Sequence, residues 1–280
     1  MIDAHLHTWD RSRSRYAWLD DAPDRLRADH PLTAALDAVG RHGVERAVLV
    51  QADETLAETA YLLELAAVEP RVAGAVVYLP LEAPDVVAAE LPRLLEDPRF
   101  VGVRNLTHDR PDPDWLLGVD QRRSIETLER AGVPIDVLAV LPRHLENLAR
   151  LAREHDGATF VLDHLGTPPV GGSDDDHRRW QDLLAEAALP NVVAKLSGIY
   201  RRSTPEQPVG ADAMRAVLDT ALEVFGAERL MIGSDWPVCT AFSGTDVTLS
   251  TLLAAVDALP EEQARRLRGE TAAEVYRLRR

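Results

Sequence analysis

Short, nearly continuous apolar runs alternate with longer mixed stretches along most of this chain. The runs are rich in valine, leucine and isoleucine, which is typical of parallel β-strands that are buried on both faces. We therefore expect strands at 2–7, 46–51, 72–79, 100–105, 134–140, 159–165, 191–197 and 229–235.

The stretches between these runs carry apolar residues at helical spacing. Many of them end at a glycine or a proline, residues that commonly terminate helices. We expect helices at 32–43, 57–70, 85–97, 124–132, 141–156, 177–188, 211–226 and 247–259, with a further helix or two after Pro260.

Eight strands alternating with eight helices predict a (β/α)8 TIM barrel, an α/β fold, as a single domain over residues 1–280. A doubly wound open sheet is the alternative, but the chain has no glycine-rich phosphate loop to support it. We expect 171–179 to be an exposed loop that enters a helix. We expect 11–23 to be a long loop after the first strand, which in a barrel forms a lid or a substrate wall.

The composition of the chain argues against some kinds of binding partner. The 280 residues are 46% apolar and carry a net charge of −15, which disfavours binding to nucleic acid or to an anionic membrane surface. Cys239 is the only cysteine, so no internal disulfide forms, and the chain shows neither a signal peptide nor an apolar stretch long enough to span a membrane. We expect a cytoplasmic enzyme, and the oligomeric state does not follow from the sequence.

Polar residues interrupt the apolar runs mainly near their carboxyl ends, where barrel active sites form. They are His5, His7, Gln51, Arg104, Asp136, His164, Lys195, Ser197 and Asp235. A ring of ionisable groups from different strands indicates a site, because burying each of them is costly unless it is paired or bound to a metal.

Structural interpretations remain open for several of these residues. A lone histidine such as His164 is more often a hydrogen-bonded core residue than a ligand, and Arg104 with Asp136 could form a buried ion pair without a catalytic role. We expect Asp163 to point to the opposite face of its strand and to support the structure. Tyr16 and Trp18, in the long loop, either line the pocket or anchor the loop to the barrel rim.

His5 and His7 are two residues apart on one expected strand. Residues i and i+2 point to the same face, with Cβ atoms roughly 6–7 Å apart. Because the first and last strands of a closed barrel are neighbours, both histidines can meet Asp235, which follows the eighth run. Such a trio can hold a metal ion or face a developing oxyanion.

Lys195 is the only lysine among 31 basic residues. In a chain that otherwise uses arginine, a retained lysine indicates a need for a slim, point-like ammonium. Lys195 and Ser197 share one face of their strand, so an inward Lys195 would lie near His164 and Asp235. The structural alternative is that it only pairs with a carboxylate in the barrel interior.

Several motifs resemble the amidohydrolase superfamily and its lactonase-like amidohydrolase 2 group, which includes L-fuconolactonases, L-rhamnonolactonases and 2-pyrone-4,6-dicarboxylate lactonases. They span nearly the whole chain: DAHLHTWD, VLVQA, FVGVRN, FVLDHLG, NVVAKLSG, GSDWPVC and GETAAEVYRL. The resemblance implies a distorted barrel that hydrolyses lactones, with His5, His7 and His164 at the reacting centre.

The same resemblance implies that Asp235 handles the proton of the attacking water. Arg104 stands where two-metal members carry a bridging lysine, and Asp136 stands in place of a histidine, so at most one metal is expected. Members of the group are divided between metal-independent enzymes and enzymes that use one zinc.

We therefore expect lactone opening in the service of carbohydrate catabolism. Without a metal, His5, His7, His164 and Lys195 would stabilise the oxyanion. With a metal, one Zn²⁺ on His5, His7 and Asp235, with or without His164, would polarise the carbonyl.

Substrate contacts are expected from the polar and aromatic residues that remain: Arg104, Gln51, Tyr16, Trp18, Asp136 and Ser197. Two other functions stay open. One is a zinc-dependent decarboxylase of the same superfamily, and the other is a barrel that only binds a ligand.

Overall fold

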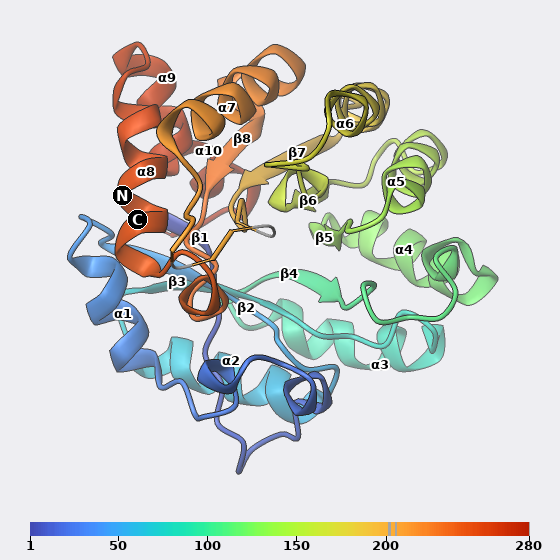
Figure 1. Cartoon of the computed structure of the whole chain (residues 1–280). Coiled ribbons are helices and arrows are strands. Elements are labelled where there is room, and N and C mark those ends of the chain that lie inside the picture. Colours follow the sequence, from blue (N-terminus) through green and yellow to red (C-terminus); the bar gives the residue numbers. More distant parts are fainter. Residues whose placement is uncertain (201–202, 205, 280) are drawn as a thin grey trace.

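A computed structural model describes residues 1–200, 203–204 and 206–279 of the chain. Eight parallel strands hydrogen-bond in sequence order and curve into a nearly closed barrel (Figure 1). The strands are β1 (Ile2–Leu6), β2 (Arg46–Val50), β3 (Val72–Val77), β4 (Phe100–Asn105), β5 (Ile135–Leu138), β6 (Phe160–Asp163), β7 (Val192–Leu196) and β8 (Leu230–Ile232). The predicted (β/α)8 barrel is confirmed.

All the strands except β4 are shorter at their carboxyl ends than the apolar runs predicted. His7, His164, Ser197 and Asp235 all lie just beyond the last ladder residue of their strands. Their backbones leave the sheet there: His164 and Asp235 adopt φ values of 55° and 54°, in the left-handed region. The polar side chains thus begin where regular pairing ends.

Backbone contacts beyond β8 complete the barrel. Leu6 and Trp236 form an isolated parallel bridge. The His7 amide donates to the Trp236 carbonyl at 2.7 Å, and the Asp235 amide donates to the His5 carbonyl at 2.8 Å. These bonds place the residues after β8 directly beside the histidines of β1.

Helices alternate with the strands and ring the barrel (Figure 1). They are α1 (Leu32–Gly40), α2 (Leu56–Val68), α3 (Pro84–Leu95), α4 (Val119–Ala131), α5 (Pro142–Glu154), α6 (Asp174–Ala187), α7 (Ala211–Phe225), α8 (Thr245–Asp257), α9 (Glu261–Arg265) and α10 (Thr271–Val275). The last two, joined by a π-helical turn at Arg266–Glu270, are the extra helices expected after Pro260.

Two segments expected to be loops contain regular structure. Helix α6 begins at Asp174, inside 171–179, because Ser173 caps it and exchanges hydrogen bonds with Asp176 in a capping box. The 11–23 segment contains a 3-10 turn at Ala17–Asp20, and a second turn starts at Asp24.

Alternation along each strand separates two apolar cores. On β2, Ala47 and Leu49 pack outward against the helices, whereas Val48 and Val50 fill the barrel interior. Ala272 and Tyr276, from α10 and the residue after it, enter the interior cluster and close one end of the barrel. Apolar side chains thus fill part of the barrel interior below the polar strand-end residues.

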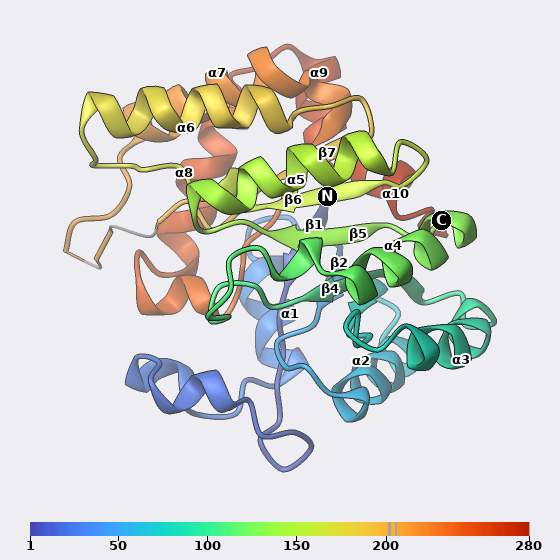
Figure 2. The same cartoon turned by 90° about the vertical axis from the view of Figure 1, so that its right-hand side faces the viewer.

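Both chain termini lie towards one end of the barrel, and the long segment after β1 lies towards the other (Figure 2). Among the described residues, no helix is both long enough and apolar enough to cross a bilayer.

Candidate active site

A pocket of about 280 Å³ opens where the polar residues leave the strands. Its lining includes His7, His164 and Asp235, and much of its wall is apolar. The apolar and aromatic side chains are Trp18, Ala52, Leu106, Leu138, Val140, Tyr200, Val238 and Phe242. A concave, mostly apolar wall with a few convergent polar groups is the usual form of a small-molecule site.

A larger depression, of about 930 Å³, lies around Met1 and Gly269 at the end of the barrel that holds the termini. Two ion pairs lie along it: Arg268 contacts Asp257, and Arg265 lies 3.2 Å from Glu270. Because the strand-end groups lie elsewhere, the smaller pocket is the candidate active site.

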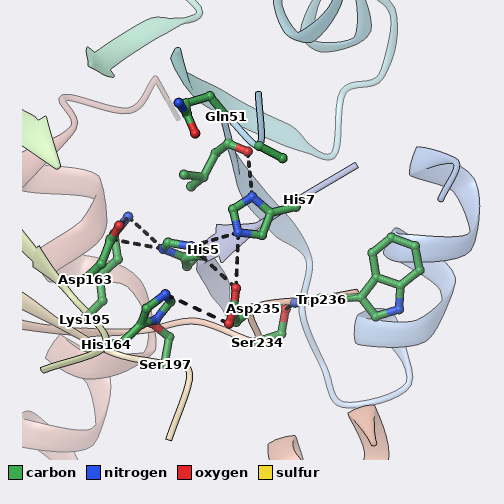
Figure 3. Close-up of polar contacts among 12 residues, drawn as sticks. His5, His7, Gln51, Asp163, His164, Lys195, Ser197, Ser234, Asp235 and Trp236 are labelled. Atoms are coloured by element: carbon green, nitrogen blue, oxygen red, sulfur yellow. Dashed lines mark hydrogen bonds and ion pairs between the residues drawn. The ribbon is translucent and has the colours of Figure 1, made fainter. Parts of the chain in front are cut away.

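His5 and His7 turn their Nε2 atoms toward each other at 3.1 Å, as Figure 3 shows. His7 Nδ1 lies 2.8 Å from the Val50 carbonyl, which can only accept a hydrogen bond. The proton of neutral His7 is therefore on Nδ1, and its Nε2 lone pair faces the site.

One ring nitrogen of His5, Nδ1, faces both a hydrogen-bond donor and a hydrogen-bond acceptor. Its Nδ1 lies 3.2 Å from Lys195 Nζ and 3.2 Å from Asp163 Oδ1. If Nδ1 donates to Asp163, the Nε2 lone pair faces the site and can bind a metal. If Nδ1 accepts from Lys195, Nε2 carries the proton and donates to His7. The surroundings of His5 thus support both tautomers.

Asp235 completes the trio of side chains. Its Oδ1 lies 3.1 Å from His7 Nε2 and 3.6 Å from His5 Nε2. The approach requires a glycine at position 233, because a Cβ there would lie 2.6 Å from His5 Cβ. Asp3 Oδ1 ties the two segments together by accepting the amides of His5 and Ser234, each at 3.0 Å.

The electrostatics favour an ionised acid and neutral bases. Burial acts to raise the pKa of Asp235, but the neighbouring imidazoles of His164, His7 and His5 outweigh it and hold that pKa below its ordinary value. Burial lowers the pKa of His5 and of His164. At neutral pH the site therefore presents the Asp235 carboxylate beside the neutral imidazoles of His5 and His164.

The trio fits one metal ion. Its three ligand atoms are separated by 3.1, 3.1 and 3.6 Å. Tetrahedral Zn²⁺ with bonds of 2.0–2.1 Å sets its ligand atoms about 3.3 Å apart, so the spacing matches. His164 Nε2 is 4.0 Å from the other oxygen of Asp235, Oδ2, and stands at the edge of this set.

A second group, His5, Asp163 and His164, also has ligand atoms close together. It is a poorer cation site, because Arg104 Nε and Lys195 Nζ already lie 2.7 and 3.2 Å from the two oxygens of Asp163. Two positive charges beside the carboxylate repel a further cation. It also shares His5 with the first group, so the geometry favours one ion at most.

Below the pocket lies a buried charge network whose pairing differs from the one considered from sequence. Arg104 pairs with Asp163, and Asp136 pairs with Lys195. Arg104 and Asp136 are opposite each other in the β4–β5 register, but their side chains bind different partners. The interpretation of Arg104 and Asp136 as an ion pair with each other is therefore wrong.

Asp163 points into the barrel rather than away from it, contrary to expectation. Inward and outward positions alternate on β6, with Val161 inside and Phe160 and Leu162 outside, so Asp163 is inside. His164 also turns inward because the strand has ended and its φ is 55°. The sequence argument extended the alternation one residue too far.

Lys195 is inward, as expected, but has no exposed surface and does not line the pocket. It contacts Asp136 and His5 instead. Asp136 also accepts hydrogen bonds from the Tyr276 hydroxyl at 2.9 and 3.0 Å. A direct substrate contact by Asp136 does not fit this buried position, and Lys195 can influence the pocket only through its neighbours, such as His5 and Asp163.

The remaining predicted residues divide between the pocket and its supports. Trp18 lines the pocket, and its indole donates to the Ala52 carbonyl at 2.6 Å. Tyr16 is fully buried beside Trp9, so it anchors the loop and does not line the pocket. Gln51 Oε1 accepts from Arg104 at 3.1 Å, and Ser197 Oγ lies 2.9 Å from His164 Nδ1. Both position other site residues.

Sequence reasoning missed four polar participants. They are Asp3, Asp163, His108 and Tyr200. Asp3 was visible in the first motif, and Asp163 in FVLDHLG, but alternation was applied too far. His108 and Tyr200 belong to loops, where the sequence carries no periodic signal.

Comparisons with known proteins agree with the fold. Residues 2–278 match the amidohydrolase family. Over 286 residues the chain is 34% identical to an L-fucono-1,5-lactonase of Burkholderia multivorans, covering 99% of this chain and 96% of that one. An L-fucono-1,5-lactonase of Burkholderia ambifaria is 34% identical over 240 residues, covering 85% and 80%.

A solved amidohydrolase from Burkholderia multivorans with bound zinc superposes with a TM-score of 0.88. Its sequence is 32% identical, and the match covers 99% of each chain. The chain described here has residue groups that could hold a metal ion, among them His5, His7 and Asp235.

Proposed function

The chain belongs to the amidohydrolase family, and on that premise we propose that it hydrolyses a neutral sugar lactone, with L-fucono-1,5-lactone as the first candidate. The protein is a hydrolase that opens lactone rings. We choose a neutral substrate because the positive charge in the pocket wall is already paired.

Arg104 is the only arginine or lysine among the described residues that line the pocket. Its Nε binds Asp163 at 2.7 Å, and its Nη1 binds the carbonyl and the side chain of Gln51 at 3.0 and 3.1 Å. The positive charge is therefore already compensated, and the carboxylate of Asp235 lies in the same pocket. A substrate with several carboxylates would meet unfavourable electrostatics here.

The apolar wall suits a sugar ring. Leu106, Leu138, Val140 and Val238 line one continuous pocket with Trp18. Sugar rings present C–H faces that pack on such side chains, and a 6-deoxy sugar lactone adds a methyl group. This lining, together with the compensated arginine, also opposes the decarboxylase alternative, whose aromatic acid substrates carry a carboxylate.

In the proposed reaction, Asp235 accepts a proton from the attacking water and returns it to the ring oxygen that leaves. Its lowered pKa keeps it ionised at neutral pH, so that an oxygen is free to accept the proton. His164 lines the pocket, and Ser197 holds its Nδ1, so its Nε2 edge is available to the lactone carbonyl. Developing negative charge on that oxygen would be stabilised there.

His5 and His7 hold the geometry around Asp235 and would be the ligands of a bound ion. A bound Zn²⁺ would polarise the carbonyl and lower the pKa of its water toward 7. Lys195 acts on this centre through His5 Nδ1, where it competes with Asp163.

A pH-indicator screen tests the proposal. The wild-type chain is assayed on L-fucono-1,5-lactone, other neutral aldonolactones and 2-pyrone-4,6-dicarboxylate, with and without chelator, against spontaneous opening. We expect turnover of neutral lactones, best on a 6-deoxy sugar. Acid release no faster than the spontaneous rate for every neutral lactone, both with added Zn²⁺ and with chelator, would refute it.

A further inference from the structure

Tyr200 is a polar neighbour of the site that the mechanism above does not use. It follows β7 in the loop toward α7 and is only 4% exposed. Its hydroxyl donates a hydrogen bond to Asp235 Oδ2. Its ring stacks on Phe242, with centroids 4.8 Å apart and planes at 27°. Both rings line the pocket.

The two oxygens of Asp235 have different surroundings. Oδ1 faces His7 and His5 at 3.1 and 3.6 Å. Oδ2 faces the Tyr200 hydroxyl, and His164 Nε2 is at 4.0 Å. One oxygen is thus directed to the histidine pair and the other to the pocket.

A carboxylate does not keep such an orientation by itself. The terminal torsion of aspartate is broad and roughly two-fold, so the plane turns easily unless a partner holds it. Both imidazoles offer lone pairs to Oδ1 when their protons are on Nδ1, and lone pairs do not hold a carboxylate oxygen in place. The phenol, which has a hydrogen to donate and a ring fixed by Phe242, can hold it.

We propose that Tyr200 is a positioning residue, which fixes the carboxylate plane of Asp235 so that Oδ1 meets the histidine pair while Oδ2 faces the substrate. This rests on the proposed function only for its kinetic consequence. The orientation itself is a property of the folded chain.

The chain offers a matched control for a purely structural role. Tyr276 is also a buried tyrosine whose hydroxyl donates to a buried carboxylate, that of Asp136, but it lies at the closed end of the barrel. Tyr200→Phe and Tyr276→Phe each remove one such hydroxyl and keep the ring. A loss of stability alone would affect both variants alike.

The kinetic test measures kcat, KM and melting temperature for the wild type and both variants on a neutral lactone. We expect Tyr200→Phe to lower kcat about tenfold or more, as loss of a group that orients a reacting residue does, with KM changed by less than about threefold. Tyr276→Phe should keep kcat within about threefold even if it melts lower. Equal losses of kcat in both variants, or a Tyr200→Phe enzyme with more than half the wild-type kcat, would overturn the proposal.

A second measurement does not depend on the substrate. Crystal structures of wild type and Tyr200→Phe, grown with chelator, should show the Asp235 carboxylate turned away from His7 in the variant only. If Asp235 superposes in the two structures, the positioning role is wrong. If the carboxylate turns but no lactone is hydrolysed by the wild type, the positioning role stands and the proposed function fails.

Discussion

The ammonium of Lys195 contacts the carboxylate of Asp136 inside the closed barrel, and neither side chain is exposed to solvent. Tyr276 caps the same carboxylate from below, and His5 lies 3.2 Å from the ammonium above. The only lysine of the chain thus joins the floor of the barrel to the first histidine of the site.

Lys195→Met should destabilise the protein strongly. It leaves Asp136 as a buried charge without its cation, which typically costs about 3–5 kcal/mol of unfolding free energy. Denaturant unfolding of the variant at pH 7 measures the loss.

A second substitution separates the charge effect from packing. Asp136→Asn in the Lys195→Met background removes the orphaned charge and keeps an acceptor for Tyr276. The double variant should therefore recover at least half of the stability that Lys195→Met loses, because residues in contact are coupled. If the stability losses of the two single substitutions simply add in the double variant, the ion pair is not the important interaction.

Asp235→Asn should leave the fold intact and nearly abolish turnover. The amide cannot take the proton of water, and loss of a general base usually costs roughly 10²–10⁴-fold. Circular dichroism checks the fold, and kcat on the best neutral lactone checks the role. A variant that keeps more than about a tenth of wild-type kcat would remove Asp235 from the mechanism.

At most one tightly bound divalent ion per chain is expected. The fit of His5, His7 and Asp235 to a single tetrahedral ion, and the two cations beside Asp163, are the reasons. Elemental analysis after gel filtration gives the stoichiometry, and His7→Asn should lower Zn²⁺ affinity in equilibrium dialysis. Two tightly bound ions that activity requires would contradict this arrangement.

Asp3 should matter to stability in a pH-dependent way. Its Oδ1 accepts the amides of His5 and Ser234, and burial raises its pKa to about 6. Asp3→Ala leaves two buried amides without an acceptor, at a cost of about 1–3 kcal/mol for each unsatisfied group. Asp3→Asn keeps an acceptor and should be milder at neutral pH.

The sign of the pH effect follows from the raised pKa. The folded protein holds the Asp3 proton more tightly than the unfolded chain, so this contribution is present below about pH 4 and is lost as the pH rises to about 6. Wild type should therefore lose stability relative to Asp3→Asn across that window. A stability difference that is flat with pH, or that changes in the opposite direction, would contradict the raised pKa.

The architecture and several candidate site residues could be predicted from the apolar runs that alternate with helical stretches along the sequence. Valine- and leucine-rich runs defined the eight strands, and polar residues near their carboxyl ends marked His5, His7 and Asp235, which the structure brings within 3.6 Å of one another. Periodicity carries this information because a barrel interior tolerates ionisable groups only where a site compensates them.

Three features could not be obtained in this way. The inward turn of His164 depends on a left-handed backbone that begins only after the strand ends. The insertion of Tyr276 into the barrel requires the C-terminal helix to close its far end. Tyr200 reaches Asp235 from a loop, where side-chain direction is set by tertiary contacts such as its stacking on Phe242.

The most direct test compares kcat/KM for L-fucono-1,5-lactone and for 2-pyrone-4,6-dicarboxylate on one preparation of the enzyme. Because Arg104 is already compensated by Asp163, we predict a preference of about 100-fold or more for the neutral lactone, equivalent to about 2.7 kcal/mol of transition-state stabilisation. A dianionic lactone opened as fast as the neutral one, or faster, would contradict the account.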